Sequence, residues 1–167
     1  MKADFILDLL ENIAEKCPKE KNLLGMDIGR KTIGLALSDS AHCIATPLKT
    51  IQRTKFSKDI RQLEDIIKDY DVGGYVLGYP INMDGSEGPR CQSVRDFALE
   101  FASQLSDSLK PDSGLWIALW DERLSTASVD NFVNETVNIK KSRAKEKGIT
   151  DKLAAQHILQ GALDFMP

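Results

Sequence analysis

The residues most able to do chemistry in this 167-residue chain are acids that adjoin apolar segments. Asp27 lies inside the apolar run 23–28, where an unpaired carboxylate costs several kcal/mol. Asp121 and Glu122 directly follow a second apolar run, and Asp151 opens the last amphipathic segment. An acid within a strand, acids at the end of another strand and an acid at the start of a helix can all meet at one edge of a sheet.

Carboxylates gathered in this way raise one another's pKa unless a cation neutralises them. Hard divalent cations with oxygen ligands suit such a group, and Mg²⁺ typically combines one or two carboxylates with waters and substrate phosphates. Two such ions about 3.5–4 Å apart activate water and stabilise the leaving oxygen of a phosphodiester. The pattern therefore suits a site for divalent cations such as Mg²⁺ that act on a phosphodiester.

Each acid also has a purely structural interpretation. Asp27 can accept hydrogen bonds from backbone amides of the turn at Gly29. Asp121 can pair with Arg123, and Asp151 is favoured at a helix start by the helix dipole. One acid alone is weak support for a catalytic site, whereas three at such positions are stronger support.

The hydropathy pattern predicts the elements that carry these acids. Hairpin strands come first and strand–helix alternation follows, which is typical of an α/β fold with one mixed sheet covered by helices on both faces. Pro47 restricts the third strand to an edge or a bend. We expect five strands, the first three antiparallel, at 23–28, 33–37, 42–51, 75–79 and 115–120, with helices at 56–70 and 94–105 and from 151 onward.

The first 22 residues read as a separate segment. Apolar residues recur at helical spacing over 4–16 and predict an amphipathic helix, which Cys17-Pro18 ends. The polar residues 19–22 read as a linker, and the main domain is expected over 23–167.

Composition and charge exclude several protein classes. The net charge of −3 excludes a wholly basic nucleic-acid coat but allows a local basic patch. The segment 138–152 is such a patch, with six cationic and two acidic residues, although a run of this kind is often only a solvated loop. No apolar run reaches the ~18–20 residues of a membrane span, and acids interrupt any signal peptide. Three scattered cysteines fit neither a disulfide framework nor a zinc site, so we expect a cytoplasmic protein with no membrane partner.

Other catalytic motifs are missing from the sequence. The loop 78–88 is rich in glycine but is followed by no Lys-Ser/Thr pair, so it is no Walker A motif. No dinucleotide-binding fingerprint is present, and neither Ser86 nor Thr126 has a convincing base. An actin-like ATPase half is excluded because one domain of this length cannot form a site between two.

Four ordered motifs resemble those of the YqgF family, whose members are described as Holliday-junction resolvases or pre-16S rRNA nucleases with an RNase H-like fold. The first is the hairpin 25–39, with Asp27 followed by Ile28 and Gly29. The resemblance covers about 23–163 and leaves the first 22 residues without a counterpart. Tyr79 stands where leucine is usual, which should only alter packing. The other three motifs are 78–88, 121–126 and 151–160.

The resemblance implies that Asp27, Glu122 and Asp151 are the catalytic and metal-binding residues, with Asp121 as an additional candidate, and that Mg²⁺ or Mn²⁺ is the cofactor. We expect nucleic acid to be contacted by Arg30, Lys31, Arg123, Lys140, Lys141, Arg143 and Lys152.

The expected function is divalent-metal-dependent endonuclease action on structured nucleic acid, with processing of the 5′ end of pre-16S rRNA in ribosome biogenesis ahead of Holliday-junction cleavage. The partners would be an rRNA precursor or a DNA junction, together with ribosomal assembly intermediates. A second class of function is a non-catalytic nucleic-acid-binding factor in rRNA maturation or transcription. The sequence indicates neither the oligomeric state nor a contact that distinguishes RNA from DNA.

Overall fold

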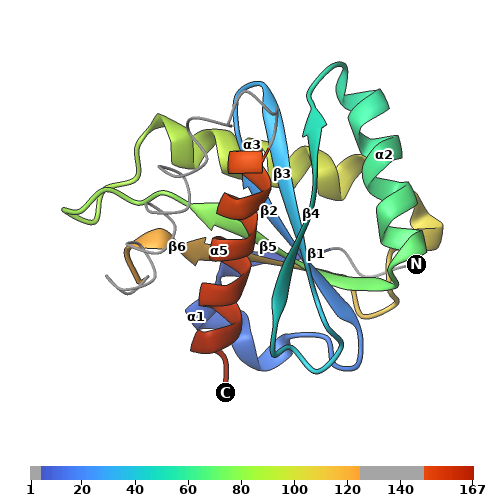
Figure 1. The fold of residues 1–167 in the computed structure, drawn as a ribbon, viewed down its shortest axis with the longest axis horizontal. Helices are drawn as coiled ribbons and strands as arrows, with labels where there is room; N and C mark the ends of the chain where they lie inside the picture. The colour runs from blue at the N-terminus through green and yellow to red at the C-terminus, as the bar shows by residue number, and fades with distance from the viewer. Residues whose placement is uncertain (1–4, 125–148) are drawn as a thin grey trace.

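A computed structural model describes residues 5–124 and 149–167. Their centre is a six-stranded mixed sheet with the strand order β1-β6-β5-β2-β3-β4 (Figure 1). Strands β2, β3 and β4 form an antiparallel meander, whereas β1, β6, β5 and β2 run parallel to one another. The strands are β1 Phe5–Leu9, β2 Asn22–Ile28, β3 Thr32–Ser38, β4 Ala45–Gln52, β5 Val72–Tyr79 and β6 Leu115–Asp121.

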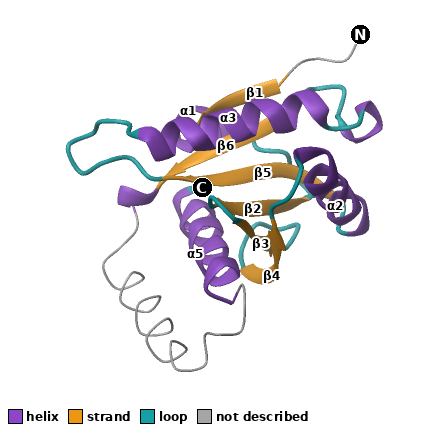
Figure 2. Cartoon of the chain, turned by 90° about the horizontal axis from the view of Figure 1, so that it is seen from above, coloured by secondary structure: helices purple, strands orange, loops and turns teal. Residues whose placement is uncertain are grey.

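Helices cover both faces of the sheet, and α2 and α5 lie on opposite sides of it (Figure 2). Helices α2 and α3 pack on one face, while α1 and α5 pack on the other. Helix α5 contacts β2, β3, β4 and β5, and it also packs against Trp120 of β6. The helices are α1 Leu10–Ile13, α2 Phe56–Asp69, α3 Pro89–Gln104 and α5 Ile149–Phe165, with short 3-10 helices at Ala14–Lys16, Asp107–Leu109 and Glu122–Leu124.

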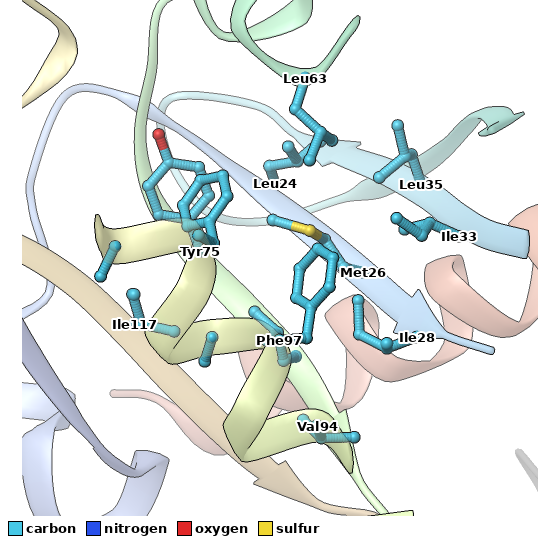
Figure 3. Close-up of a cluster of buried hydrophobic side chains, with 14 of the residues drawn as sticks. Leu24, Met26, Ile28, Ile33, Leu35, Leu63, Tyr75, Val94, Phe97 and Ile117 are labelled. Carbon is cyan, nitrogen blue, oxygen red and sulfur yellow. The ribbon is translucent and has the colours of Figure 1, made fainter. Parts of the chain in front are cut away.

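Side-chain alternation along β2 separates the hydrophobic core from the candidate chemistry. Leu24, Met26 and Ile28 point into the core beneath α2 and α3, and Figure 3 shows Met26 and Ile28 near Phe97 and Leu24 near Leu63. The alternate residues face α5, because a Cβ atom added at Gly25 would lie 2.7 Å from the Cβ of Leu159. Asp27 is two residues after Gly25 in the same strand, so it also lies on the α5 face.

The expectation of five strands is wrong, because residues 5–9 form a sixth strand. The expected helix over 4–16 is likewise wrong in its first half, and only Leu10–Ile13 form an α-helix before the chain turns at Cys17-Pro18. Strand β1 pairs in parallel with β6, from Phe5 opposite Leu115 to Leu9 opposite Leu119. A short apolar run is compatible with either a helix or a strand. Residues 5–9 form a strand because they pair with the edge of β6 that would otherwise be open.

Strand directions also differ from the expectation that the first three strands are antiparallel. The first strand of the chain, β1, is parallel to its neighbour, and the antiparallel run is β2-β3-β4. Pro47 lies on the edge strand β4, where the pairing register shifts between Leu35 and Ala36. The predicted edge or bend at Pro47 is therefore confirmed. No helix among the described residues is long and apolar enough to cross a membrane.

Deleting residues 1–16 is expected to lower the melting temperature by about 10 °C. Leu10 and Ile13 are buried against β6, and the indole Nε1 of Trp116 donates to the carbonyl of Ile13 at 2.9 Å. Burying each of these side chains contributes about 1.5–3 kcal/mol, and each kcal/mol corresponds to about 2–4 °C in a chain of this size. Thermal unfolding followed by circular dichroism measures the change. An unchanged melting temperature would show that β1 and α1 do not support the sheet.

Candidate active site

Asp27 lies near the carboxyl end of β2, half-buried on the face that α5 covers. Across the antiparallel pair its partner in register is Gly34 of β3. In the parallel direction, Met26 pairs with Leu77, so Asp27 and Gly78 are the next residues of β2 and β5. Glycines therefore flank the carboxylate on both neighbouring strands, and Asp151 and Ile158 of α5 fill the space that side chains at Gly34 and Gly78 would take.

Asp151 is brought to this carboxylate by the first turn of α5. The hydroxyl of Thr32 at the start of β3 donates to the Oδ2 of Asp151 at 3.0 Å. The backbone of Asp151 lies against Gly34 so closely that a Cβ atom there would overlap the Asp151 carbonyl oxygen. Since Gly34 is opposite Asp27, the start of α5 is held beside the candidate catalytic strand.

The electrostatics of Asp27 are those of a carboxylate without sufficient neutralisation. Burial raises the pKa of the Asp27 carboxyl, and the negative charge of Asp151 raises it further. The guanidinium of Arg90, at the start of α3, acts in the opposite direction. Asp27 and Asp151 thus interact as like charges, which is the condition that a bound cation relieves.

Asp121 points to the other face of the sheet. A Cβ atom at Gly161 of α5 would lie 3.1 Å from the Trp120 ring, so Trp120 faces α5 and the next residue in β6 faces away. Asp121 is 6% exposed and binds Arg123, whose Nη2 lies 2.9 Å from its Oδ2 and whose Nε lies 3.1 Å from its Oδ1. Asp121 therefore forms an ion pair with Arg123, which is the structural interpretation that the sequence offered for this acid.

Glu122 turns back toward the α5 face. It begins the 3-10 helix Glu122–Leu124, and its carboxyl carbon lies 3.6 Å from the position that a Cβ atom would take at Gly78. Gly78 is the neighbour of Asp27 on β5, so the Glu122 carboxyl lies on the β5 side of Asp27 and Asp151 lies on the β3 side. The side chain is exposed and accessible from solvent.

The three carboxylates do not form a closed metal site as they stand. Within 5–124 and 149–167, no three acidic, histidine or cysteine side chains are grouped closely enough to hold a metal ion. Their chemistry nonetheless fits a hard divalent cation, because all the donors are oxygens and the half-buried Asp27 carboxyl lies within the field of the negative charge of Asp151. The residues that would hold such an ion are Asp27, Glu122 and Asp151.

The basic residues expected to contact nucleic acid fall into four groups. Arg30 and Lys31 are exposed in the turn between β2 and β3. Lys152 is half-exposed in the first turn of α5, next to Asp151. Arg123 is already bound to Asp121. The remaining three, Lys140, Lys141 and Arg143, lie outside the described residues.

Tyr79 does more than alter packing, in contrast to the expectation from sequence. Its buried hydroxyl accepts a hydrogen bond from Arg95 Nε at 2.5 Å, and the Arg95 guanidinium lies 5.1 Å from the centre of the Tyr79 ring. Arg95 also pairs with Glu87 at 3.4 Å. Burial is the main reason that the pKa of the Tyr79 hydroxyl is raised to about 12. The network fastens the loop after β5 to α3.

Sequence reasoning missed two residues that act on the candidate site, Thr32 and Arg90. The sequence predicts that Thr32 is part of a turn. Only the packing of α5 shows that the Thr32 hydroxyl orients Asp151. Arg90 had a usable signal, because Pro89 is typical of the first position of a helix and so places Arg90 in the first turn of α3. A helix that follows β5 begins at the same sheet edge as Asp27.

A family model described as "RuvX: Holliday junction resolvase" matches residues 21–165, which is most of the chain. The chain belongs to this family. A protein of Paramagnetospirillum magneticum named "Putative pre-16S rRNA nuclease" is 51% identical over 146 residues, covering 87% of each chain. A protein of the same name from Ruegeria sp. is 47% identical over 162 residues, covering 97% of this chain and 96% of the relative.

RuvX membership confirms the resemblance that the four motifs indicated. The expectation that the first 22 residues lack a counterpart is wrong for the Ruegeria relative, because a match over 97% of the chain includes most of them. Thermus thermophilus RuvC, solved in complex with a Holliday junction substrate, superposes with a TM-score of 0.53 at 10% identity, covering 86% of this chain and 93% of RuvC. The RuvX chain thus shares the α/β resolvase fold.

Asp27→Asn is expected to raise the melting temperature at pH 7 in the absence of divalent cations. The folded-state pKa of Asp27 is raised, so the folded chain binds more protons than the unfolded one between the two pKa values, and ionisation destabilises it as pH rises. The asparagine removes that cost, and each kcal/mol recovered corresponds to about 2–4 °C.

The advantage of Asp27→Asn should shrink as pH falls through the raised folded-state pKa, and it should be absent below the unfolded-state pKa. Thermal scans from pH 3 to pH 8 with a chelator present measure it, and Asp112→Asn, at an exposed carboxylate in the loop before β6, is the control. A variant less stable than the wild type at pH 7 would contradict the electrostatic assignment.

Proposed function

We propose that this RuvX-family protein is a divalent-metal-dependent endonuclease that hydrolyses phosphodiester bonds in structured nucleic acid, with the precursor of 16S rRNA as its substrate. The observation that carries the proposal is the half-buried Asp27 on β2, with Asp151 beside it across Gly34 and the Glu122 carboxyl beside it across Gly78. The relatives named as pre-16S rRNA nucleases support the choice of reaction and substrate.

Asp27, Glu122 and Asp151 are the proposed ligands of Mg²⁺ or Mn²⁺. When bound, the cations supply activation of the attacking water and charge stabilisation at the phosphate. The residues of the chain position them: Thr32 fixes the Asp151 carboxylate, and Gly34 allows the start of α5 to approach β3. Asp121 serves the site indirectly by holding Arg123 in the 3-10 helix that carries Glu122.

A second candidate substrate is the four-way DNA junction. The family description and the fold shared with RuvC support it, and the phosphodiester chemistry at the three acids would be the same. The remaining alternative is a nucleic-acid-binding factor without cleavage. It predicts binding that survives replacement of all three acids.

The test offers the purified chain a precursor 16S rRNA 5′ fragment and a four-way DNA junction side by side, each with Mg²⁺ or Mn²⁺ or with a chelator. We expect metal-dependent cleavage of the RNA at a defined position and slower cleavage of the junction. The reverse order would replace the rRNA substrate by DNA. Binding of either probe without cleavage under any metal condition would overturn the enzymatic proposal.

A further inference from the structure

A groove of about 770 Å³ lies at the carboxyl edge of the sheet, beside the end of β2 that follows Asp27, and none of the three acids lines it. Its walls come from the β2–β3 turn, from the loop between β4 and α2, and from the first three turns of α3. Each of these three walls contributes an arginine: Arg30, Arg53 and Arg90. Of these only Arg30 was expected from sequence to contact nucleic acid.

Arg53 is held in place by the protein itself. Its Nη1 donates to the carbonyl of Gly29 at 2.6 Å, and its guanidinium lies 5.6 Å from the centre of the Phe97 ring. The next residue, Thr54, donates from its backbone N–H and its hydroxyl to buried Asp59, at 3.0 and 3.1 Å. A charged side chain fixed in this way loses little conformational entropy when it binds an anion.

The charge of the groove is uneven along its length. Asp96 and Glu100 also line it, but they follow Arg90 on α3 by six and ten residues, or about 9 and 15 Å along the helix. Among the described residues no carboxylate pairs with Arg30, Arg53 or Arg90 within ion-pair distance. The positive charge is therefore concentrated at the end of the groove that meets the sheet edge.

We propose that this groove binds the phosphodiester backbone of the substrate strand on one side of the bond that is cut, with Arg30, Arg53 and Arg90 contacting its phosphates. This inference rests on the proposed function. Arginine suits the role because its planar guanidinium can donate two parallel hydrogen bonds to a phosphate. The strand would pass over the sheet edge, from Asp27 on the α5 face to the groove beside α3.

The groove adjoins the acids closely enough for one strand to occupy both. Gly29 and Arg30 follow Asp27 and Ile28 directly in the chain, and Ile28 and Gly29 line the groove. The Arg90 guanidinium is near enough to Asp27 to lower the pKa of its carboxyl. A nucleic-acid strand, unlike a single small anion, presents successive phosphates that can meet the acids and the groove together.

The test measures binding without cleavage, so that its result is independent of catalysis. A fluorescent RNA hairpin and a DNA four-way junction are titrated with the full-length protein in a chelator at several salt concentrations. One variant carries both Arg30→Gln and Arg90→Gln. The control variant, Lys68→Gln, removes a single positive charge elsewhere. Lys68 is exposed on α2, twelve residues or about 18 Å beyond the helix start near the groove. Arg53 is left unchanged because it supports the β2–β3 turn.

The expected result is a shallower salt dependence of binding for the double variant. Each lost phosphate contact reduces the slope of log K against log salt by about 0.7 to 0.9, so the double variant should lose about 1.4 to 1.8. Lys68→Gln should retain the wild-type slope, and circular dichroism should show that all the variants are folded.

A double variant with the wild-type slope would overturn the proposal, as would an equal loss in Lys68→Gln or no measurable binding by the wild type. If the double variant loses the expected salt dependence but the wild type cleaves neither probe, the groove assignment stands and only the nuclease assignment is refuted. A loss confined to one probe identifies whether RNA or DNA occupies the groove.

Discussion

Asp27→Asn is expected to lower the rate of phosphodiester cleavage at least about a thousandfold while the chain stays folded. Activation of water and stabilisation of charge at the phosphate contribute several kcal/mol, and each 1.36 kcal/mol is a tenfold change in rate. The amide preserves the shape of the half-buried side chain and removes the negative charge that would attract the cation. Single-turnover cleavage at saturating substrate measures the effect on chemistry directly.

Two neighbouring acids serve as matched comparisons for Asp27. Glu122→Gln should behave like Asp27→Asn, because the Glu122 carboxyl lies beside Gly78 on the same face. Asp121→Asn should cost no more than about tenfold in rate, or about 1.4 kcal/mol, since its carboxylate faces the other way and binds Arg123. Cleavage by Asp27→Asn within tenfold of the wild type, or an inactive Asp121→Asn beside an active Glu122→Gln, would refute the assignment.

Gly34→Ala is expected to reduce cleavage about a hundredfold although Gly34 carries no functional group. The added Cβ would overlap the backbone carbonyl of Asp151, so the start of α5 must move away from β3. A displacement of about 1 Å at a catalytic group can cost a hundredfold in rate. Overpacking also costs about 1–3 kcal/mol, which lowers the melting temperature by several degrees.

Gly88→Ala separates this effect from a general effect of replacing glycine. A Cβ atom at Gly88 would lie 3.5 Å from the flexible amide of Asn82 and meets no backbone, and the φ of −90° accommodates alanine. Its activity and melting temperature should stay near the wild type. Full activity in Gly34→Ala would show that the close approach of α5 to β3 is not needed to position Asp151.

The order of strands and helices from residue 22 onward follows from local patterns in the sequence. The hairpin of β2 and β3 is marked by two apolar runs around a polar turn, and Pro47 correctly predicts an edge strand. The strand β1 could not be predicted in this way. Residues 5–9 contain Phe, Ile and Leu in a run that suits either a helix or a strand, and the outcome depends on the unpaired edge of β6 more than 100 residues later.

The choice between Asp121 and Glu122 shows what the sequence contains and what it lacks. Strand alternation after Trp120 predicts that adjacent acids face opposite sides, but it cannot tell which side carries the site. That requires the packing of Gly161 of α5 against Trp120. The contact of Thr32 with Asp151 joins residues 119 positions apart and leaves no local signal.

The most direct test of the account is the position of a bound divalent cation. Crystals of the protein grown or soaked with Mn²⁺ would be measured for anomalous scattering, which locates the ion independently of the protein density. The account predicts a peak bounded by the carboxylates of Asp27, Glu122 and Asp151, and no peak at that place in Asp27→Asn crystals. A Mn²⁺ ion held instead by Asp121, or no ion near Asp27 when Mn²⁺ supports cleavage, would contradict it.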